Sequence, residues 1–248
     1  MDIRKLAAEG HTEEIERQLL DLDSQFSFSC QKCGKCCEHQ NSILISPRDI
    51  FYIAKKLQIT PKEVIEKYAE TYIGSASKSP VIRMVPRGKN EACPFLKDGL
   101  CAIHDCRPTV CALFPLTRMV ISKIALNESQ DESDLDLEVK YMLSDIDCGS
   151  GKRVYTVREW LAHSGIPEQD EFFLLWSGLS IRLRGMISKL EEKHASDVAL
   201  DFFWTAIYKA LYEHYDTSKE FLPQFRQAVE TLTVLSQETI KTMERFPD

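Results

Sequence analysis

Apolar residues recur every three or four positions over much of the chain, a period that predicts amphipathic helices. Two of these helices carry clear start signals, because Pro47 follows Ser46 and Pro61 follows Thr60, and proline suits the first helical position. Glu63 completes a capping box with Thr60. The pattern predicts helices over residues 12–23, 47–57, 61–72, 168–193, 197–214 and 218–245.

Shorter segments, several of them rich in β-branched and aromatic residues, predict a few strands between the helices. They cover residues 26–29, 81–85, 119–125 and 139–143. The stretch 128–138 has six acidic residues and no basic one, so we expect a solvated loop rather than an acidic binding tail.

Helices dominate and the strands are short, so the expected fold class is α+β and predominantly helical. The last third is helical in pattern, and a capping box at Thr156 and Glu159 marks its start. Its many aromatic residues predict the core of a helix bundle rather than a substrate groove. We therefore expect three regions: an N-terminal helix in residues 1–27, a loop-rich cysteine domain in residues 28–155, and a helical region in residues 156–248.

With 248 residues, 44% of them hydrophobic, the chain can bury a substantial core. Its net charge of −7 at pH 7 argues against a general nucleic-acid binder, since such proteins usually show a basic excess. Charges interrupt the first residues, which argues against a secretory signal, and the longest strongly apolar run, near residues 172–176, is too short to span a membrane. These features predict a cytoplasmic protein without a membrane partner.

Nine cysteines are the most informative feature of the composition. In a reducing compartment thiols stay free, and clustered thiols hold metal. A disulfide framework fits less well, because the number of cysteines is odd and two of them are adjacent.

Four cysteines crowd into eight consecutive positions. Cys30, Cys33 and Cys36 form two overlapping Cys-x2-Cys units, a spacing that lets thiolates reach one metal and that also occurs in iron–sulfur ligand runs. Gly34 suits the tight turn that this spacing requires. Cys37 adjoins Cys36, and adjacent side chains diverge, so we expect either two neighbouring centres or one centre and a separate thiol.

A second group of cysteines follows the two predicted helices that begin with proline. It comprises Cys93, Cys101, Cys106 and Cys111. Asp98 and Gly99 predict a turn that brings Cys93 and Cys101 together. One more cysteine, Cys148, precedes a glycine-rich segment that lacks the spacing of a phosphate-binding loop.

Several motifs occur in a fixed order along the chain. They are Cys-x2-Cys-Gly-x-Cys-Cys from residue 30, Ile-Ser-Pro-x-Asp-Ile from residue 45, Cys-Pro-Phe-Leu from residue 93, Cys-x-Ile-His-x-x-Arg-Pro-x-x-Cys from residue 101 and Phe-Pro from residue 114. With the Cys148 segment, this combination resembles the CxxCxxCC cysteine-cluster family, the YkgJ-like zinc- or iron-chelating domains, over about residues 28–155.

The resemblance implies metal binding by a set of eight thiolates. The implied ligands are Cys30, Cys33, Cys36, Cys37, Cys93, Cys101, Cys111 and Cys148. Cys106 falls at a variable position of the family pattern, so we expect it to be an extra thiol. Ala112 stands where the family often has an arginine, which puts a local ion pair in doubt but leaves the ligand set unchanged.

The implied cofactor is either an iron–sulfur cluster, with 4Fe–4S favoured, or zinc. The overlapping Cys-x2-Cys run and the all-thiolate ligand set favour the cluster. His39 and His104 are alternative ligands, although His104 better fits a packed or hydrogen-bonding ring.

Three functions remain open on the sequence. A metal-binding cysteine-cluster protein is the leading one. An iron–sulfur protein-modifying enzyme has support by analogy alone, because a flagellin lysine N-methylase resembles the family and contains such a cluster. A zinc-stapled interaction module is the third. No catalytic residue and no methyl-donor motif stands out, and the existence of a protein partner is left open.

Overall fold

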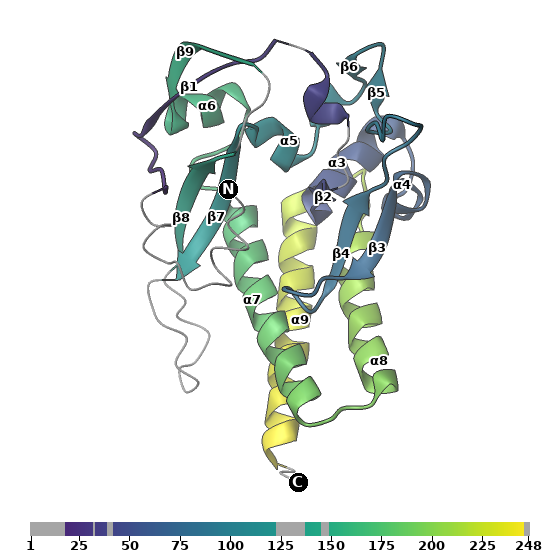
Figure 1. Ribbon diagram of the computed structural model, residues 1–248. Coiled ribbons are helices and arrows are strands. Elements are labelled where there is room, and N and C mark those ends of the chain that lie inside the picture. The colour runs from purple at the N-terminus through teal and green to yellow at the C-terminus, as the bar shows by residue number, and fades with distance from the viewer. Residues whose placement is uncertain (1–17, 32, 39–41, 123–136, 145–148, 246–248) are drawn as a thin grey trace. The chain divides into compact units, whose positions relative to one another are not determined.

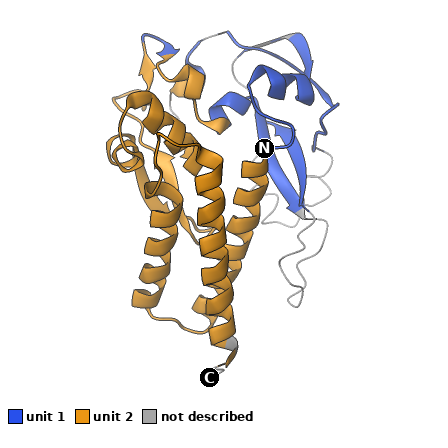
Figure 2. Cartoon of the chain, turned by 180° about the vertical axis from the view of Figure 1, so that it is seen from behind, with its two compact units in different colours: residues 1–36, 98–100, 110–170 blue, residues 37–97, 101–109, 171–248 orange. Residues whose placement is uncertain are grey.

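The computed structural model describes residues 18–31, 33–38, 42–122, 137–144 and 149–245. Its chain forms two compact units, each built from several segments of the sequence (Figure 2). The first unit comprises residues 1–36, 98–100 and 110–170, and the second comprises residues 37–97, 101–109 and 171–248. The fold is α+β and rich in helix, as the sequence predicts.

The first unit contains two antiparallel strand pairs and two short helices (Figure 1). Strand β1 (Gln25–Ser29) pairs with β9 (Ser150–Thr156), and β7 (Leu116–Ser122) pairs with β8 (Leu137–Leu143). The helices are α5 (Thr109–Leu113) and α6 (Val157–His163). The capping box that the sequence predicts at Thr156 is present at the start of α6.

Aromatic packing holds the first unit together. Phe26 and Phe28 are buried while the residues between and beside them are more exposed, as the alternation along β1 predicts. Both rings meet the ring of Trp160 edge to face, with centroids 5.8 Å and 5.7 Å apart. Leu161 of α6, which is fully buried, completes this core beneath β1.

The second unit contains a three-stranded antiparallel sheet in the order β2-β4-β3. Its strands are β2 (Leu44–Ile45), β3 (Ala69–Ile73) and β4 (Pro80–Met84), and its first helices are α3 (Pro47–Leu57) and α4 (Pro61–Tyr68). A two-stranded hairpin, β5 (Leu96–Lys97) with β6 (Leu100–Cys101), and two short 3-10 turns, η1 (Lys35–Cys37) and η2 (His104–Cys106), carry the cysteines. Three residues of these small elements, Lys35, Cys36 and Leu100, belong to the first unit.

Three long helices complete the second unit and lie side by side in Figure 1. They are α7 (Glu171–Glu192), α8 (Asp197–Tyr208) with its π-helical continuation η4 (Lys209–Glu213), and α9 (Phe221–Arg245). Phe172, Tyr212 and Phe225 are buried where these helices meet, so most of the C-terminal aromatic residues form a core, as the sequence predicts. Phe202 is an exception, because 63% of it is exposed. None of the helices in the described parts of the chain is both long and apolar enough to cross a bilayer.

The helix starts that capping residues mark agree with the sequence, whereas the predicted starts at 168 and 218 lie three residues before those of α7 and α9. The capping boxes at Ser46 and Thr60 are both present, and α3 covers the predicted residues 47–57. The predicted helix over residues 61–72 is wrong in its last turn. Residues from Ala69 onward leave α4 and pair with β4, because a strand partner supplies their main-chain hydrogen bonds.

The predicted N-terminal helix is also wrong where the structure describes it. Residues 18–23 are not helical, and Leu20 exchanges main-chain hydrogen bonds with Tyr141 of β8 at 2.7 Å and 3.0 Å. The carbonyl group of Leu22 accepts a hydrogen bond from Arg158 N–H of α6. The rest of this predicted helix, and most of the acidic loop predicted over residues 128–138, lie outside the described residues.

Candidate metal centre

The first cysteine group lies on the loop that follows β1. Cys30 comes directly after the last residue of the strand, and η1 ends the loop with Cys36 and Cys37. Cys30, Cys33 and Cys36 are exposed, whereas Cys37 is half-buried. The two adjacent cysteines therefore differ in exposure, and the boundary between the two units falls between them.

The turn within this loop lies beside the turn of the β5–β6 hairpin. Gly34 has a φ of 76°, the left-handed conformation that glycine adopts without cost. A Cβ atom at Gly34 would lie 3.9 Å from the carbonyl oxygen of Gly99. Asp98 and Gly99 both have positive φ, 49° and 75°, which is the geometry of a tight two-residue hairpin turn. The turn predicted at these two residues is confirmed.

The second cysteine group belongs mostly to the second unit. Cys93 N–H donates to the carbonyl oxygen of Cys37 at 2.7 Å, which ties the end of the first group to the start of the second. Cys93, Cys101 and Cys106 are half-buried against the core of this unit. Burial raises the pKa of the Cys106 thiol, and the nearby Asp105 carboxylate and Cys101 raise it further.

The histidine and the charged residues around η2 are engaged with one another. Arg107 donates a hydrogen bond to Nε2 of His104 at 2.8 Å, which favours the hydrogen-bonding role expected for this ring. Lys56 of α3 forms an ion pair with Asp105 at 2.5 Å and holds the pKa of that carboxyl below its usual range. The other candidate, His39, lies outside the described residues.

Asp49 joins the starts of two helices. Its Oδ2 atom accepts from the backbone N–H and the hydroxyl of Ser46, at 2.8 Å and 2.7 Å, which completes the capping box of α3. Its Oδ1 atom accepts from the backbone N–H and the hydroxyl of Thr109, both at 2.8 Å. Thr109 is the first residue of α5, which carries Cys111. The Ser-Pro-x-Asp motif therefore has a second role that capping rules alone do not reveal.

The other end of α5 is held by side chains of α6. Trp160 donates its indole N–H to the carbonyl oxygen of Leu113 at 2.8 Å, and Ser164 donates its hydroxyl to that of Ala112 at 2.9 Å. These are carbonyl groups that a five-residue helix cannot satisfy by itself. Both ends of the helix that carries Cys111 thus depend on distant residues, and neither signal is visible in the sequence around Cys111.

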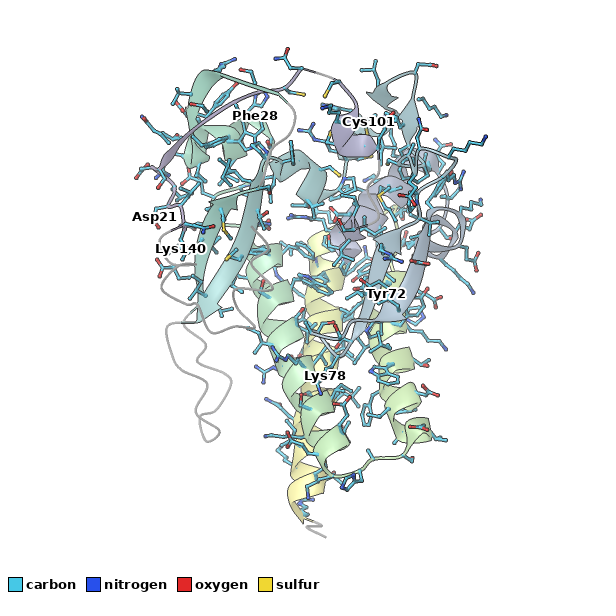
Figure 3. The ribbon with its side chains drawn as sticks, viewed as in Figure 1. Asp21, Phe28, Tyr72, Lys78, Cys101 and Lys140 are labelled. Carbon is cyan, nitrogen blue, oxygen red and sulfur yellow. The ribbon has the colours of Figure 1, made fainter. Side chains whose placement is uncertain are left out.

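A glycine beside Cys148 allows the chain to pass close to β1. Gly149 has a φ of 82°, and a Cβ atom there would lie 2.5 Å from the ring of Phe28, which is labelled in Figure 3. The next residue, Ser150, pairs with Ser29, the last residue of β1 before Cys30. The sequence suggested a loop here and did not predict β9. Cys148 itself lies outside the described residues.

The predicted ligands are divided between the two units. Cys30, Cys33, Cys36 and Cys111 belong to the first, and Cys37, Cys93 and Cys101 belong to the second. No disulfide joins any two of the described cysteines. Within the described residues, no group of three or more histidine, cysteine, aspartate or glutamate side chains is arranged to hold a metal ion.

A helix-rich α+β chain with cysteines gathered on loops and short helical turns has the features of a metal-chelating cysteine domain. Residues 29–137 match the family model CxxCxxCC, described as "Putative zinc- or iron-chelating domain". This segment is less than half of the chain, so the chain is similar to that family over residues 29–137. The match includes the predicted ligands from Cys30 to Cys111 and ends before Cys148. No curated protein and no solved structure matches the chain.

Proposed function

We propose that this chain is a cytoplasmic iron–sulfur protein, whose thiolates hold a 4Fe–4S cluster. One observation carries the proposal: eight of the nine cysteines lie in the segment that matches a zinc- or iron-chelating family. Thiolates are soft ligands, and a set made of thiolates alone suits zinc or iron–sulfur clusters rather than magnesium or calcium. The two overlapping Cys-x2-Cys units favour the cluster over zinc.

The contacts around the thiols support this donor set. Nε2 of His104 accepts a hydrogen bond from Arg107, whose guanidinium has donors but no acceptor, so this nitrogen has a partner other than a metal. The cysteines therefore remain the best donors among the described residues of the loops. Cys36 and Cys37 belong to different units, which supports their being ligands of different metal centres.

The local framework supports a preformed position for some ligands. Cys30 follows a paired strand whose two phenylalanine side chains are buried, and Cys111 lies on a helix with both ends hydrogen bonded to distant side chains. Ligands that are fixed before metal arrives lose less conformational freedom on binding. This argument applies equally to zinc and to a cluster, so the metal must be measured.

Anaerobic purification of the full chain, followed by iron, zinc and acid-labile sulfide analysis, tests the cofactor. We expect iron and sulfide in similar amounts and the broad visible absorption of an iron–sulfur cluster. A colourless protein with stoichiometric zinc and no sulfide would refute the cluster and support a zinc-stapled module. In that case chelation should unfold the cysteine domain, because a structural zinc contributes its binding energy to folding.

Paired cysteine variants test the ligand assignment separately from the choice of metal. Cys33→Ser should lower the metal content, because it removes a predicted ligand. Cys106→Ser is the matched control: it removes a half-buried thiol that is expected to be an extra one, and it should leave the metal content unchanged. Equal losses in both variants would contradict the assignment of Cys106.

A further inference from the structure

Strand β3 forms an open edge of the three-stranded sheet. The order β2-β4-β3 gives it one partner, β4, and no described strand pairs with its other side. Most of its side chains are exposed, including Tyr72 and Ile73 at 41% and 39%. Tyr72 is labelled in Figure 3. An open strand edge presents main-chain groups that can pair with another chain.

The hydrogen bonds at the two ends of β3 reveal which of these groups are available. Val85 N–H donates to the carbonyl of Tyr68, and Gly74 N–H donates to the carbonyl of Ser79. In an antiparallel pair the direction alternates along the strand, so Glu70 and Tyr72 also point their main chain toward β4.

The main chains of Ala69, Thr71 and Ile73 therefore point away from β4. The N–H of Ala69 is used by the last turn of α4, where it donates to the carbonyl of Ile65. Within the described residues, the N–H and carbonyl groups of Thr71 and Ile73 have no main-chain partner on this side. These four groups line up at the open edge.

Nothing in the sequence of β3 protects this edge. Exposed edges are usually guarded by lysine, proline or a bulge, and Ala-Glu-Thr-Tyr-Ile contains none of these. Its one charge, Glu70, is paired with Arg83 of β4, whose Nε lies 2.8 Å from the carboxylate. The guanidinium of Arg83 also lies 5.4 Å from the centre of the Tyr72 ring. The edge is therefore nearly neutral and able to pair.

We propose that β3 pairs antiparallel with β3 of a second copy of this chain, about a two-fold axis at Thr71. The N–H and carbonyl groups of the two Thr71 residues then bond to each other. The N–H of Ile73 meets the carbonyl of Ala69 in the second copy. All five residues overlap, and three of the four available groups of each copy are used; the carbonyl of Ile73 lies opposite the N–H of Ala69, which α4 already uses.

Charge makes this register suitable for two identical strands. Glu70 lies opposite Tyr72 of the second copy, so no two like charges are opposite each other. Shifting the axis to Glu70 would place two carboxylates directly opposite and would be disfavoured. An extended peptide of another protein would meet the same main-chain groups. A second copy is favoured because the outward-pointing groups and the charges of β3 match those of an identical strand about a two-fold axis.

Replacing Thr71 by residues of opposite charge tests the pairing. All variants are compared as full-length chains with the same metal content. Light scattering after gel filtration should show the wild type at twice the 28.5 kDa of one chain. Thr71→Lys and Thr71→Glu should each be monomeric, because like charges then face each other at the axis. A one-to-one mixture of the two variants should regain the dimer mass.

The mixture separates pairing from other effects of the substitutions. Both variants lose the Thr71 hydroxyl, so a regained dimer reports charge complementarity alone. Thr231→Lys is the control, because it adds the same charge to an exposed residue of α9. A monomeric wild type, a dimeric Thr71→Lys, or a mixture that stays monomeric would each overturn the proposal.

Discussion

Replacing Asp49 by asparagine should weaken the junction between α3 and α5. The carboxylate accepts four hydrogen bonds, two from Ser46 and two from Thr109, at 2.7–2.8 Å. Asparagine has the same shape, but one of its two polar ends donates instead of accepting. The hydroxyl facing the new amide can rotate and accept, whereas the backbone N–H beside it cannot. Asp49→Asn therefore leaves one backbone N–H without an acceptor.

The size of the effect follows from that lost acceptor. Asp49 is 6% exposed, so water cannot readily replace the missing partner. An unsatisfied donor at such a site costs about 1–3 kcal/mol, and the remaining bonds weaken because they no longer involve a charge. We expect a loss of about 2 kcal/mol in the free energy of unfolding, which is a roughly 30-fold shift in the equilibrium.

Urea unfolding of the full chain, at equal metal content, measures this loss. Glu63→Gln is the matched control, because Glu63 forms the same capping box on α4 but its side chain is 40% exposed and bonds to no second helix. We expect it to cost no more than about 0.5 kcal/mol. If Asp49→Asn is no more destabilising than Glu63→Gln, the argument for a buried double cap is wrong.

Two further changes test the first unit, each by chemical denaturation. Arg118→Met should cost about 3–5 kcal/mol, because Arg118 and Asp170 form an ion pair at 2.9 Å with both side chains at most 4% exposed. Adding Asp170→Leu should recover much of that loss, and a double variant worse than the single one would contradict this. Gly149→Ala should cost about 1–3 kcal/mol more than Gly165→Ala, because both glycines have positive φ but a Cβ atom at Gly149 alone would collide with Phe28. Equal losses would show that the contact with Phe28 can relax.

Local chemistry made parts of the cysteine framework predictable. The Asp98-Gly99 turn was readable because both residues tolerate positive φ, and both adopt it. The engagement of His104 with Arg107 agrees with the role expected for that ring, and the two residues are only three positions apart.

The sequence by itself determined where helices begin and which residues can donate to a metal. Ser46, Thr60 and Thr156 each bond to a residue three positions later, so the signal and its partner lie within one turn. Tertiary structure decided what lies farther along the chain: where α4 gives way to β3, which strand pairs with β1, and that Asp49 caps α5 as well as α3. The physical reason is that such hydrogen bonds join residues that folding brings together, and no local pattern records the partner. The cysteine motif is local and readable, but its division between two compact units is a property of the folded chain.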